Sequence, residues 1–305
     1  MSGVSHKPVN KAARDFIRSM ADQVSMPRVY HEVRRLIQNQ QSTLEDFSRI
    51  IETDSMLSVR LVRIANSSYF GYPSRATSVY KSIVIIGLMQ LHDLILNSLS
   101  LRLFSSIPLQ VFNPEEFWRY KIECGIAART LAQYSQIYPL NPFFTLGLLH
   151  EIGHAAMFAK HPELSLQAME KAATNQSSLV EIERGLFGFD YTQAGVALMR
   201  QWHLPVSYHQ ACAYHLHPEL ASESNRQTVC IVHLAHMLRQ NLPNEQSAVH
   251  LEECRRLDSQ LARLPSNITD IVRAEVAAHT DDVLEMLWPH NVGFTDFPAG
   301  EEDDG

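Results

Sequence analysis

The stretch that decides the fold is residues 141–154, with the sequence NPFFTLGLLHEIGH. Asn141-Pro142 is typical of a helix start, because asparagine caps free backbone N–H groups and proline fits the first helical turn. Apolar residues then recur with helical spacing at Leu146, Leu149 and Met157. The pattern predicts one helix that carries the polar segment HEIGH within a largely apolar sequence.

Helix starts of the same kind recur along the whole chain. Capping residues or early carboxylates precede apolar runs with a period near that of the α-helix. Starts are predicted at the Ser42-Thr43-Leu44-Glu45 capping box, Asp54, Asn113-Pro114, Ser178, Asp190 and Thr280-Asp281-Asp282. Strand signals are nearly absent, because the β-branched residues at 83–86 lie between a cap at Ser78 and a stop at Gly87. The sequence therefore predicts an all-α protein, a multi-helix bundle.

Composition and charge disfavour several classes of protein. The 305 residues are 45% hydrophobic and 19% charged, which is enough for one large core or two modest ones. No apolar run reaches the roughly 18 residues of a membrane span. No secretion signal is visible in residues 1–24, so a cytoplasmic protein is expected. The net charge of −7 and the acidic run at 301–304 disfavour nucleic acid as a partner.

Isolated cysteines, tryptophans and basic residues are interpreted first as structural. The cysteines form no C-x-x-C motif and are expected to be buried thiols in a reducing compartment: Cys124, Cys212, Cys230 and Cys254. The tryptophans Trp118, Trp202 and Trp288 are expected to be packing anchors. The basic residues around one loop are interpreted as a solvated face, with phosphate binding as the alternative: Arg60, Arg63, Arg75 and Lys81.

His150-Glu151-Ile152-Gly153-His154 matches the H-E-x-x-H motif of zinc peptidases. On one helix the two histidines share a face suited to one zinc ion, with the glutamate beside them as general base. A peptidase also needs a third ligand, but Met157 and Lys160 stand where the metzincin motif has glycine and histidine. A glutamate further along remains a candidate ligand, so the zinc peptidase is kept as a minor alternative.

The wider segment at 147–153, GLLHEIG, resembles the G-L-L-H-D-I-G segment of the HD phosphohydrolase superfamily. The segment at 61–71, LVRIANSSYFG, with its loop residues Asn66, Ser67, Tyr69 and Gly71, resembles the front half of the HDOD domain. HDOD is the HD-related output domain of bacterial signalling proteins. The segments WHLP at 202–205 and YHLHP at 214–218 follow in the order typical of that family.

This resemblance implies a particular domain organisation. We expect an HDOD domain at 25–240, with a front helical half at 25–110 and an HD-domain-like half at 111–240. A helical lead-in at 1–24 precedes it, and a C-terminal helical extension with an acidic tail follows at 241–305.

The resemblance also implies a metal site, because HD hydrolases hold one or two metal ions with histidines and aspartates from several helices. Position by position, Tyr120, Tyr191 and Leu216 stand where those enzymes have ligands, and such side chains are poor ligands or none. The potential donors that survive are His150, Glu151, His215 and His236. We interpret them as a hydrogen-bonded polar cluster, with one divalent metal ion, zinc or iron, as the alternative. His154 is then interpreted as incidental to the site.

The resulting hypothesis is a stand-alone HDOD signalling module that acts by protein–protein contact, with a degenerate metal site and no hydrolase activity. Its partners are expected to be signalling proteins in trans, because 1–24 and 241–305 are too short for a further domain. A metal-dependent phosphohydrolase with a reduced mononuclear site is the second hypothesis. Two alternatives stay open: nucleotide binding without turnover, and a homodimer through a last helix that carries Leu284, Leu287 and Trp288.

Overall fold

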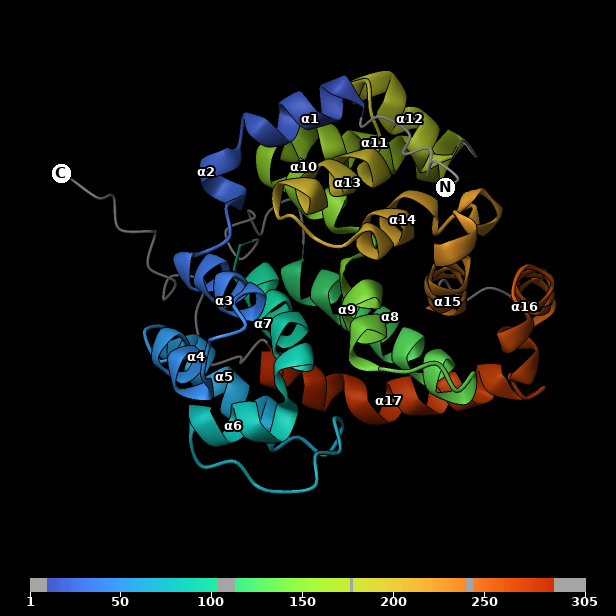
Figure 1. The fold of residues 1–305 in the computed structure, drawn as a ribbon. Helices are drawn as coiled ribbons and strands as arrows, with labels where there is room; N and C mark the ends of the chain where they lie inside the picture. Colours follow the sequence, from blue (N-terminus) through green and yellow to red (C-terminus); the bar gives the residue numbers. More distant parts are fainter. Residues whose placement is uncertain (1–9, 104–112, 176–177, 240–243, 288–305) are drawn as a thin grey trace. The chain divides into compact units, whose positions relative to one another are not determined.

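The structure is a computed structural model, and it describes residues 10–103, 113–175, 178–239 and 244–287. Within these ranges every regular element is a helix (Figure 1), so the predicted all-α fold is confirmed. The chain forms two compact units. Unit 1 comprises Met1–Ser25 and Ile107–Thr280, and unit 2 comprises Met26–Ser106 and Asp281–Gly305.

Unit 2 is built on five consecutive helices: α3 (Arg28–Gln38), α4 (Leu44–Ile51), α5 (Ser55–Ala65), α6 (Val79–Ile86) and α7 (Leu88–Leu103). Helix α6 packs on α4 and α5, and α7 packs on α3 and α5. The last turns of α17, beyond Thr280, belong to the same unit. Leu284 and Leu287 on these turns are buried, so they pack inside the protein and offer no exposed dimer face. Trp288 lies outside the described residues.

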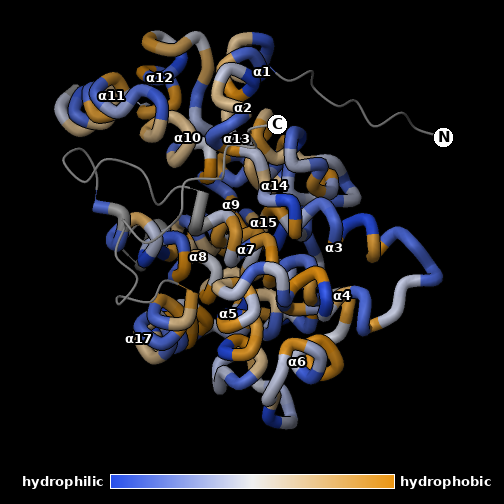
Figure 2. Tube along the Cα trace, turned by 90° about the vertical axis from the view of Figure 1, so that its left-hand side faces the viewer, coloured by the Kyte–Doolittle hydropathy of each residue, from blue (hydrophilic) through white to orange (hydrophobic). Residues whose placement is uncertain are grey.

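Unit 1 contains the remaining helices: α1 (Lys11–Arg18), α2 (Ala21–Val24), α8 (Pro114–Tyr134), α9 (Asn141–Leu149), α10 (Ile152–Lys160), α11 (Pro162–Asn175), α12 (Leu179–Phe187), α13 (Tyr191–Gln201), α14 (Val206–Tyr214), η1 (Pro218–Leu220), α15 (Glu223–Arg239), α16 (Asn244–Leu257), η2 (Ser259–Arg263) and most of α17 (Ile268–Leu287). Helix α8 packs against α9 and α15, and α13 packs against α1, α10 and α14. Hydrophobic and hydrophilic residues alternate along these helices (Figure 2), as expected where one side of each helix is buried.

Most of the predicted helix starts are present. Asp54 caps α5 through Leu57 N, Asn113 caps α8 ahead of Pro114, and Asp190 caps α13 in a capping box with Gln193. Ser78 and Gly87 bound α6 as predicted, and Gly87 has a φ of 83°. The first capping box is shifted by one residue, because Thr43 is the cap and Asp46 completes the box.

Two local predictions are wrong. The last helix begins at Ile268, and Thr280 lies inside it. The Thr280 hydroxyl donates to Val276 O, so its hydrogen bond is made within the helix and it does not act as a cap. Arg60 is not part of a solvated face, because it is buried and donates to Ser98 O at 2.8 Å.

The structural interpretation of the cysteines and tryptophans holds. All four cysteines are free and buried, and Trp118 and Trp202 are buried in unit 1. Trp202 donates from Nε1 to Val24 O at 2.7 Å, which ties α2 to the end of α13. Among the described residues, no helix combines the length and the apolar character that a membrane crossing requires.

Candidate metal centre

The stretch that contains His150 and Glu151 is bent, and the bend places both side chains. Helix α9 ends at Leu149 with His150 as its C-cap, and α10 begins at Ile152 with Glu151 as its N-cap. The single helix predicted through this stretch is therefore wrong. Because the two residues lie at the junction of two helices, both can point toward the same interior point.

Two glycines let the helices on either side of the break pack closely against their neighbours. A Cβ atom on Gly147 would lie 2.4 Å from Cys124 O on α8, and a Cβ atom on Gly153 would lie 1.9 Å from Tyr191 O on α13. Real Cβ atoms never come so close, so only glycine lets α9 approach α8 and α10 approach α13 at these points. The two glycines of the GLLHEIG segment thus set the packing around the two residues between them.

The structure brings together all four predicted donors. His150 and Glu151 come from the α9–α10 junction, His215 caps the C-terminus of α14, and His236 lies in the last turn of α15. All four residues are buried, and their ligand atoms lie within 4.8 Å of one another. The three imidazole rings are mutually near-perpendicular, with centroids 4.8–5.2 Å apart.

The spacing of these atoms suits one ion. His236 Nδ1 lies 3.1 Å from His150 Nε2 and 3.5 Å from Glu151 Oε1, and His150 Nε2 lies 3.8 Å from Glu151 Oε2. Ligands about 2.0–2.1 Å from a tetrahedral zinc ion are about 3.3 Å apart. The cluster is therefore able to hold one divalent metal ion, and the mixture of imidazole and carboxylate suits zinc or iron.

Backbone hydrogen bonds fix two of the imidazoles in the tautomer that a ligand needs. His150 Nδ1 donates to Gly147 O at 2.7 Å, and His215 Nδ1 donates to Cys212 O at 3.0 Å. The Nε2 lone pairs of both rings therefore face the centre of the cluster, as in many metal sites. Because His150 accepts at Nε2, the bond between His150 and His236 requires a proton on His236 Nδ1.

Burial keeps the imidazoles neutral and the carboxylate charged. Burial lowers the pKa of His150 to about 3 and also lowers the pKa values of His215 and His236. Burial alone would raise the pKa of Glu151, but the Lys121 ammonium and the neighbouring imidazoles lower it well below its ordinary value. The cluster thus consists of three neutral rings around one negative charge.

Lys121, which was not predicted from the sequence, supplies the opposite charge. This lysine follows Tyr120 on α8, is only 2% exposed, and forms an ion pair with Glu151 Oε2. Its ammonium also lies 4.8 Å from the ring centroid of Phe117 and 4.9 Å from that of Tyr120. A lysine in the middle of the apolar α8 pattern, next to a predicted ligand position, is the signal that indicates a buried partner carboxylate.

At the three positions predicted to be degenerate, two tyrosines form hydrogen bonds to the cluster and one leucine does not. Tyr191 is 4% exposed, and its hydroxyl donates to His215 Nε2 at 2.9 Å. The Tyr120 hydroxyl lies 3.2 Å from His236 Nδ1. Burial raises the pKa of both tyrosines, so both remain neutral phenols. Leu216 is half-buried in the turn after α14 and has no donor atom.

His154 lies apart from the cluster. Its ring stacks on Tyr191 with centroids 3.9 Å apart, and its Nδ1 lies 3.5 Å from Glu183 Oε1. The H-E-x-x-H motif requires both histidines on one continuous helix, but the chain breaks between them. Glu183, one of the downstream glutamates considered as a third peptidase ligand, is also buried. Burial raises its pKa to about 8, and it accepts a hydrogen bond from Tyr191 N.

The predicted motif loop lies in unit 2 and serves the local fold. The Asn66 side chain bonds both backbone groups of Ala76, donating to its carbonyl at 2.9 Å and accepting from its N–H at 2.8 Å. Ser67 Oγ accepts from Tyr69 N, Tyr69 is buried, and Gly71 has a φ of 67°. These four residues hold the loop between α5 and α6 in shape.

A family model for the HDOD domain matches residues 24–218. The chain belongs to the HDOD family. The resemblance seen in the sequence is thereby confirmed, whereas the boundaries expected at 110 and 240 stay predictions. A curated relative from Treponema pallidum (strain Nichols), described as an uncharacterized protein, is 23% identical over 232 residues. The matched region is 74% of this chain but 45% of that relative, so the chain spans about half of the relative's length.

Solved structures share the fold of this HDOD protein. An HDOD domain protein with unknown function from Geobacter sulfurreducens matches with a TM-score of 0.70 and 19% identity over 90% of this chain and 98% of that one. A Shewanella amazonensis SB2B protein that its description proposes to be a phosphohydrolase matches with a TM-score of 0.69 and 18% identity, covering 91% and 97%. A proposed signal transduction protein from Marinobacter aquaeolei VT8 matches with a TM-score of 0.63 and 20% identity, covering 92% and 66%. Identities this low establish the shared fold alone.

Proposed function

We propose that this HDOD protein is a regulatory module that acts by contact with a signalling protein, and that its buried cluster is structural. The observation that carries the proposal is the buried ion pair between Lys121 and Glu151. In this arrangement the lysine ammonium provides the positive charge that a metal ion provides in an HD hydrolase.

The charge balance of the cluster supports this proposal. One carboxylate and one ammonium cancel, and the three imidazoles are neutral at neutral pH. A divalent cation would have to share Glu151 with the ammonium in a poorly solvated interior, where repulsion between like charges is strong. It would also have to displace the Nδ1 proton of His236 and the Tyr191 hydroxyl that occupies His215 Nε2.

The burial of the cluster supports the same conclusion. Metal-assisted hydrolysis needs an open coordination position at which water and a phosphoester meet. Here His150, His215 and His236 are at most 2% exposed, and phenol rings stand at two of the expected ligand positions. A substrate would have to pass tightly packed helices to reach the cluster.

A mononuclear phosphohydrolase is the second candidate, and the compact donor set favours it. His150, Glu151, His215 and His236 would hold the ion, which would lower the pKa of a bound water and polarise a phosphoester. The protein's own contribution would be to fix the histidine tautomers through Gly147 O and Cys212 O.

A phosphodiesterase assay separates the two candidates. Protein purified without chelator is incubated with bis(p-nitrophenyl) phosphate and added Zn²⁺, Fe²⁺ or Mn²⁺. We expect no turnover above that of the His150→Asn variant, in which the asparagine amide replaces Nδ1 as the donor to Gly147 O. Turnover that is lost in His150→Asn and His215→Ala but kept in His154→Ala would establish the hydrolase instead.

A complementation test addresses the regulatory role directly. If the cluster is structural, a folded His150→Asn protein restores the phenotype of a strain that lacks the chromosomal gene as well as wild type does. A folded variant that fails to restore it would mean that the cluster performs chemistry in the cell.

A further inference from the structure

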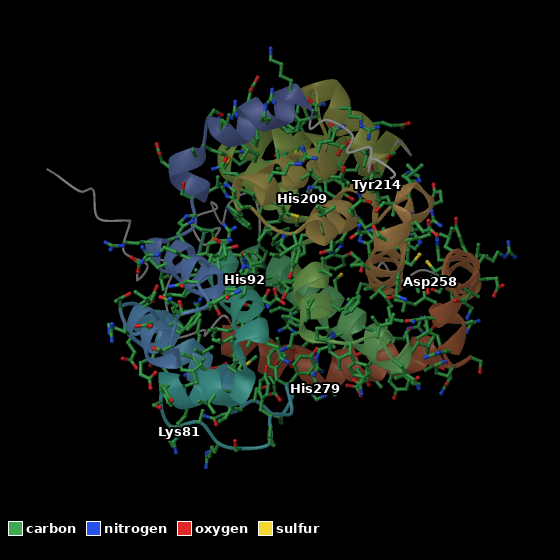
Figure 3. The ribbon with its side chains drawn as sticks, viewed as in Figure 1. Lys81, His92, His209, Tyr214, Asp258 and His279 are labelled. Carbon is green, nitrogen blue, oxygen red and sulfur yellow. The ribbon has the colours of Figure 1, made fainter. Side chains whose placement is uncertain are left out.

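A second site lies in unit 1, in a cavity of about 410 Å³ that the family resemblance does not predict. Its walls come mainly from α13 and α14, and Figure 3 labels two of the lining residues on α14, His209 and Tyr214. The volume falls in the range of about 300–1,000 Å³ that is common for small-molecule sites. The lining combines apolar side chains such as Val196 with several polar and cationic ones.

The hydrogen bonds within the walls leave donors facing the cavity. Gln210 is 9% exposed, and its Oε1 accepts from Ser222 N at 3.1 Å. A backbone N–H can only donate, so this bond fixes which end of the amide is the oxygen. The Nε2 group of Gln210 is therefore the donor that remains, and within the described part of the chain it has no partner.

The orientation of the Gln193 side-chain amide is fixed in the same way. The Asn10 side chain accepts from Ala12 N, so its other atom is the amide nitrogen, which donates to Gln193 Oε1 at 3.0 Å. The backbone N–H of Asp190 donates to the same oxygen at 3.3 Å. Gln193 therefore also has only its Nε2 donor left for a ligand.

Two arginines, Arg184 and Arg200, line the cavity. Arg184 and His217 each have an acidic partner: Arg184 Nε lies 2.6 Å from Asp190 Oδ2, and His217 Nδ1 lies 3.4 Å from Glu219 Oε1. Arg200, at the end of α13, lines the cavity, and its side chain forms no ion pair or hydrogen bond with any residue that the structure describes. One guanidinium and two amide donors thus face a partly apolar space.

We propose that this cavity binds a small organic oxyanion, with Arg200, Gln193 and Gln210 as the donors. Guanidinium and amide N–H groups pair well with phosphate or carboxylate oxygens, and the apolar wall accommodates the carbon skeleton. The phosphate monoester and the carboxylate are two sources of the same chemistry. This inference is independent of the regulatory role proposed above.

The test is calorimetric titration of the intact chain in Tris-chloride buffer with three probes that share one ring: phenyl phosphate, benzoate and neutral benzyl alcohol. We expect at least one anion to bind with a dissociation constant below about 1 mM, and benzyl alcohol not to bind. The anion that binds more tightly identifies the source. Failure of both anions, or equal binding of benzyl alcohol, overturns the proposal.

Two variants locate the binding. Gln210→Glu keeps the acceptor for Ser222 N but turns the free donor into a carboxylate oxygen, so we expect binding to be abolished. Arg200→Ala is expected to weaken binding at least about tenfold. Arg18→Ala is the matched control, because Arg18 is also an arginine in the last turn of a unit 1 helix and is exposed. Should Gln210→Glu fail to fold, Arg200→Ala decides, since unchanged affinity in that variant overturns the proposal.

Discussion

The buried cluster and the cavity share two helices, α13 and α14, but they are built in opposite ways. In the cluster, Tyr191 on α13 and His215 after α14 are bonded to each other and sealed from solvent. In the cavity, Gln193 on α13 and Gln210 on α14 have used their oxygens inside the protein and still present donors.

The two regions differ in whether their hydrogen-bonding groups are satisfied within the protein. A polar cluster that satisfies its own hydrogen bonds and charges stabilises the fold and needs no ligand. A cavity wall that presents amide donors and a guanidinium group without a partner among the described residues is stabilised when an anion binds. We therefore expect changes to the cluster to affect stability, and changes to the cavity to affect binding.

The largest expected effect comes from Lys121→Met. Removing the ammonium leaves Glu151 buried without its counter-charge, so the free energy of unfolding in the presence of EDTA should fall by about 3–5 kcal/mol. Urea denaturation checks this value. The double variant Lys121→Met/Glu151→Gln should recover much of the loss, and Lys171→Met at an exposed site on α11 should change stability by less than about 0.5 kcal/mol. A loss below about 1 kcal/mol in Lys121→Met would show that the pair is not a true buried ion pair.

Acidification should have the next largest effect. Burial lowers the pKa of His150 to about 3 and the pKa values of His154 and His233 to about 4, whereas the unfolded chain binds these protons near pH 6.5. The stability that the neutral histidines contribute to the folded protein is complete above pH 6.5 and is lost as the pH falls. Each such histidine costs about 1.4 kcal/mol per pH unit below that value. Glu183, with its pKa raised to about 8, has the opposite effect. The folded protein keeps its carboxyl protonated where the unfolded chain would release the proton, which lowers stability, and this loss becomes smaller as the pH falls toward 4.5.

For these three histidines and Glu183, the loss expected between pH 6 and pH 5 is about 3 kcal/mol, because Glu183 offsets one histidine, and the lowered pKa values of His215 and His236 add to the loss in the same direction. Denaturation in urea at the two pH values, in metal-free buffer, measures it. A free energy of unfolding that is unchanged or higher at pH 5 would mean that the histidines are charged or solvated in the folded protein.

Two tyrosines, one in the cluster and one in the cavity wall, allow the two regions to be compared through a smaller change in stability. Tyr191→Phe removes the hydroxyl that donates to the buried His215 Nε2 and should cost about 1–3 kcal/mol. Tyr214→Phe, in the half-buried wall of the cavity, should cost less than about 0.5 kcal/mol. Thermal unfolding of both variants checks the pair. Equal losses would contradict the contrast between a closed cluster and an open cavity.

The smallest expected effect on stability is that of Arg200→Ala. The side chain is half-buried at the cavity wall and has no partner among the described residues, so its loss should change the free energy of unfolding by less than about 0.5 kcal/mol. The same variant should lose anion binding. A large loss of stability would instead make Arg200 part of the packing of α13.

The sequence predicted the features that depend on neighbours within one turn. Asp54, Asn113 and Asp190 act as caps where expected, because a capping side chain reaches backbone groups only two or three residues away. The four donors of the cluster were predicted from the family resemblance, and the structure places them together.

The features that were missed depend on contacts between distant segments. Next to the break between α9 and α10, Gly153 approaches Tyr191 O, which lies on another helix. Lys121 is buried because Glu151, 30 residues away, pairs with it. The donors of the cavity follow from which amide oxygens Ser222 N and Asn10 already occupy, and no local pattern encodes such a choice.

We propose that the Lys121 ammonium takes the place of a metal ion in the cluster. The metal content of wild-type and Lys121→Met protein, purified without chelator and dialysed against Zn²⁺, is measured by plasma mass spectrometry. We expect wild-type protein without stoichiometric metal and a variant that gains about one zinc ion per chain, held by the freed Glu151 and the three histidines. One or two tightly held ions per wild-type chain, lost in His150→Asn, would contradict it.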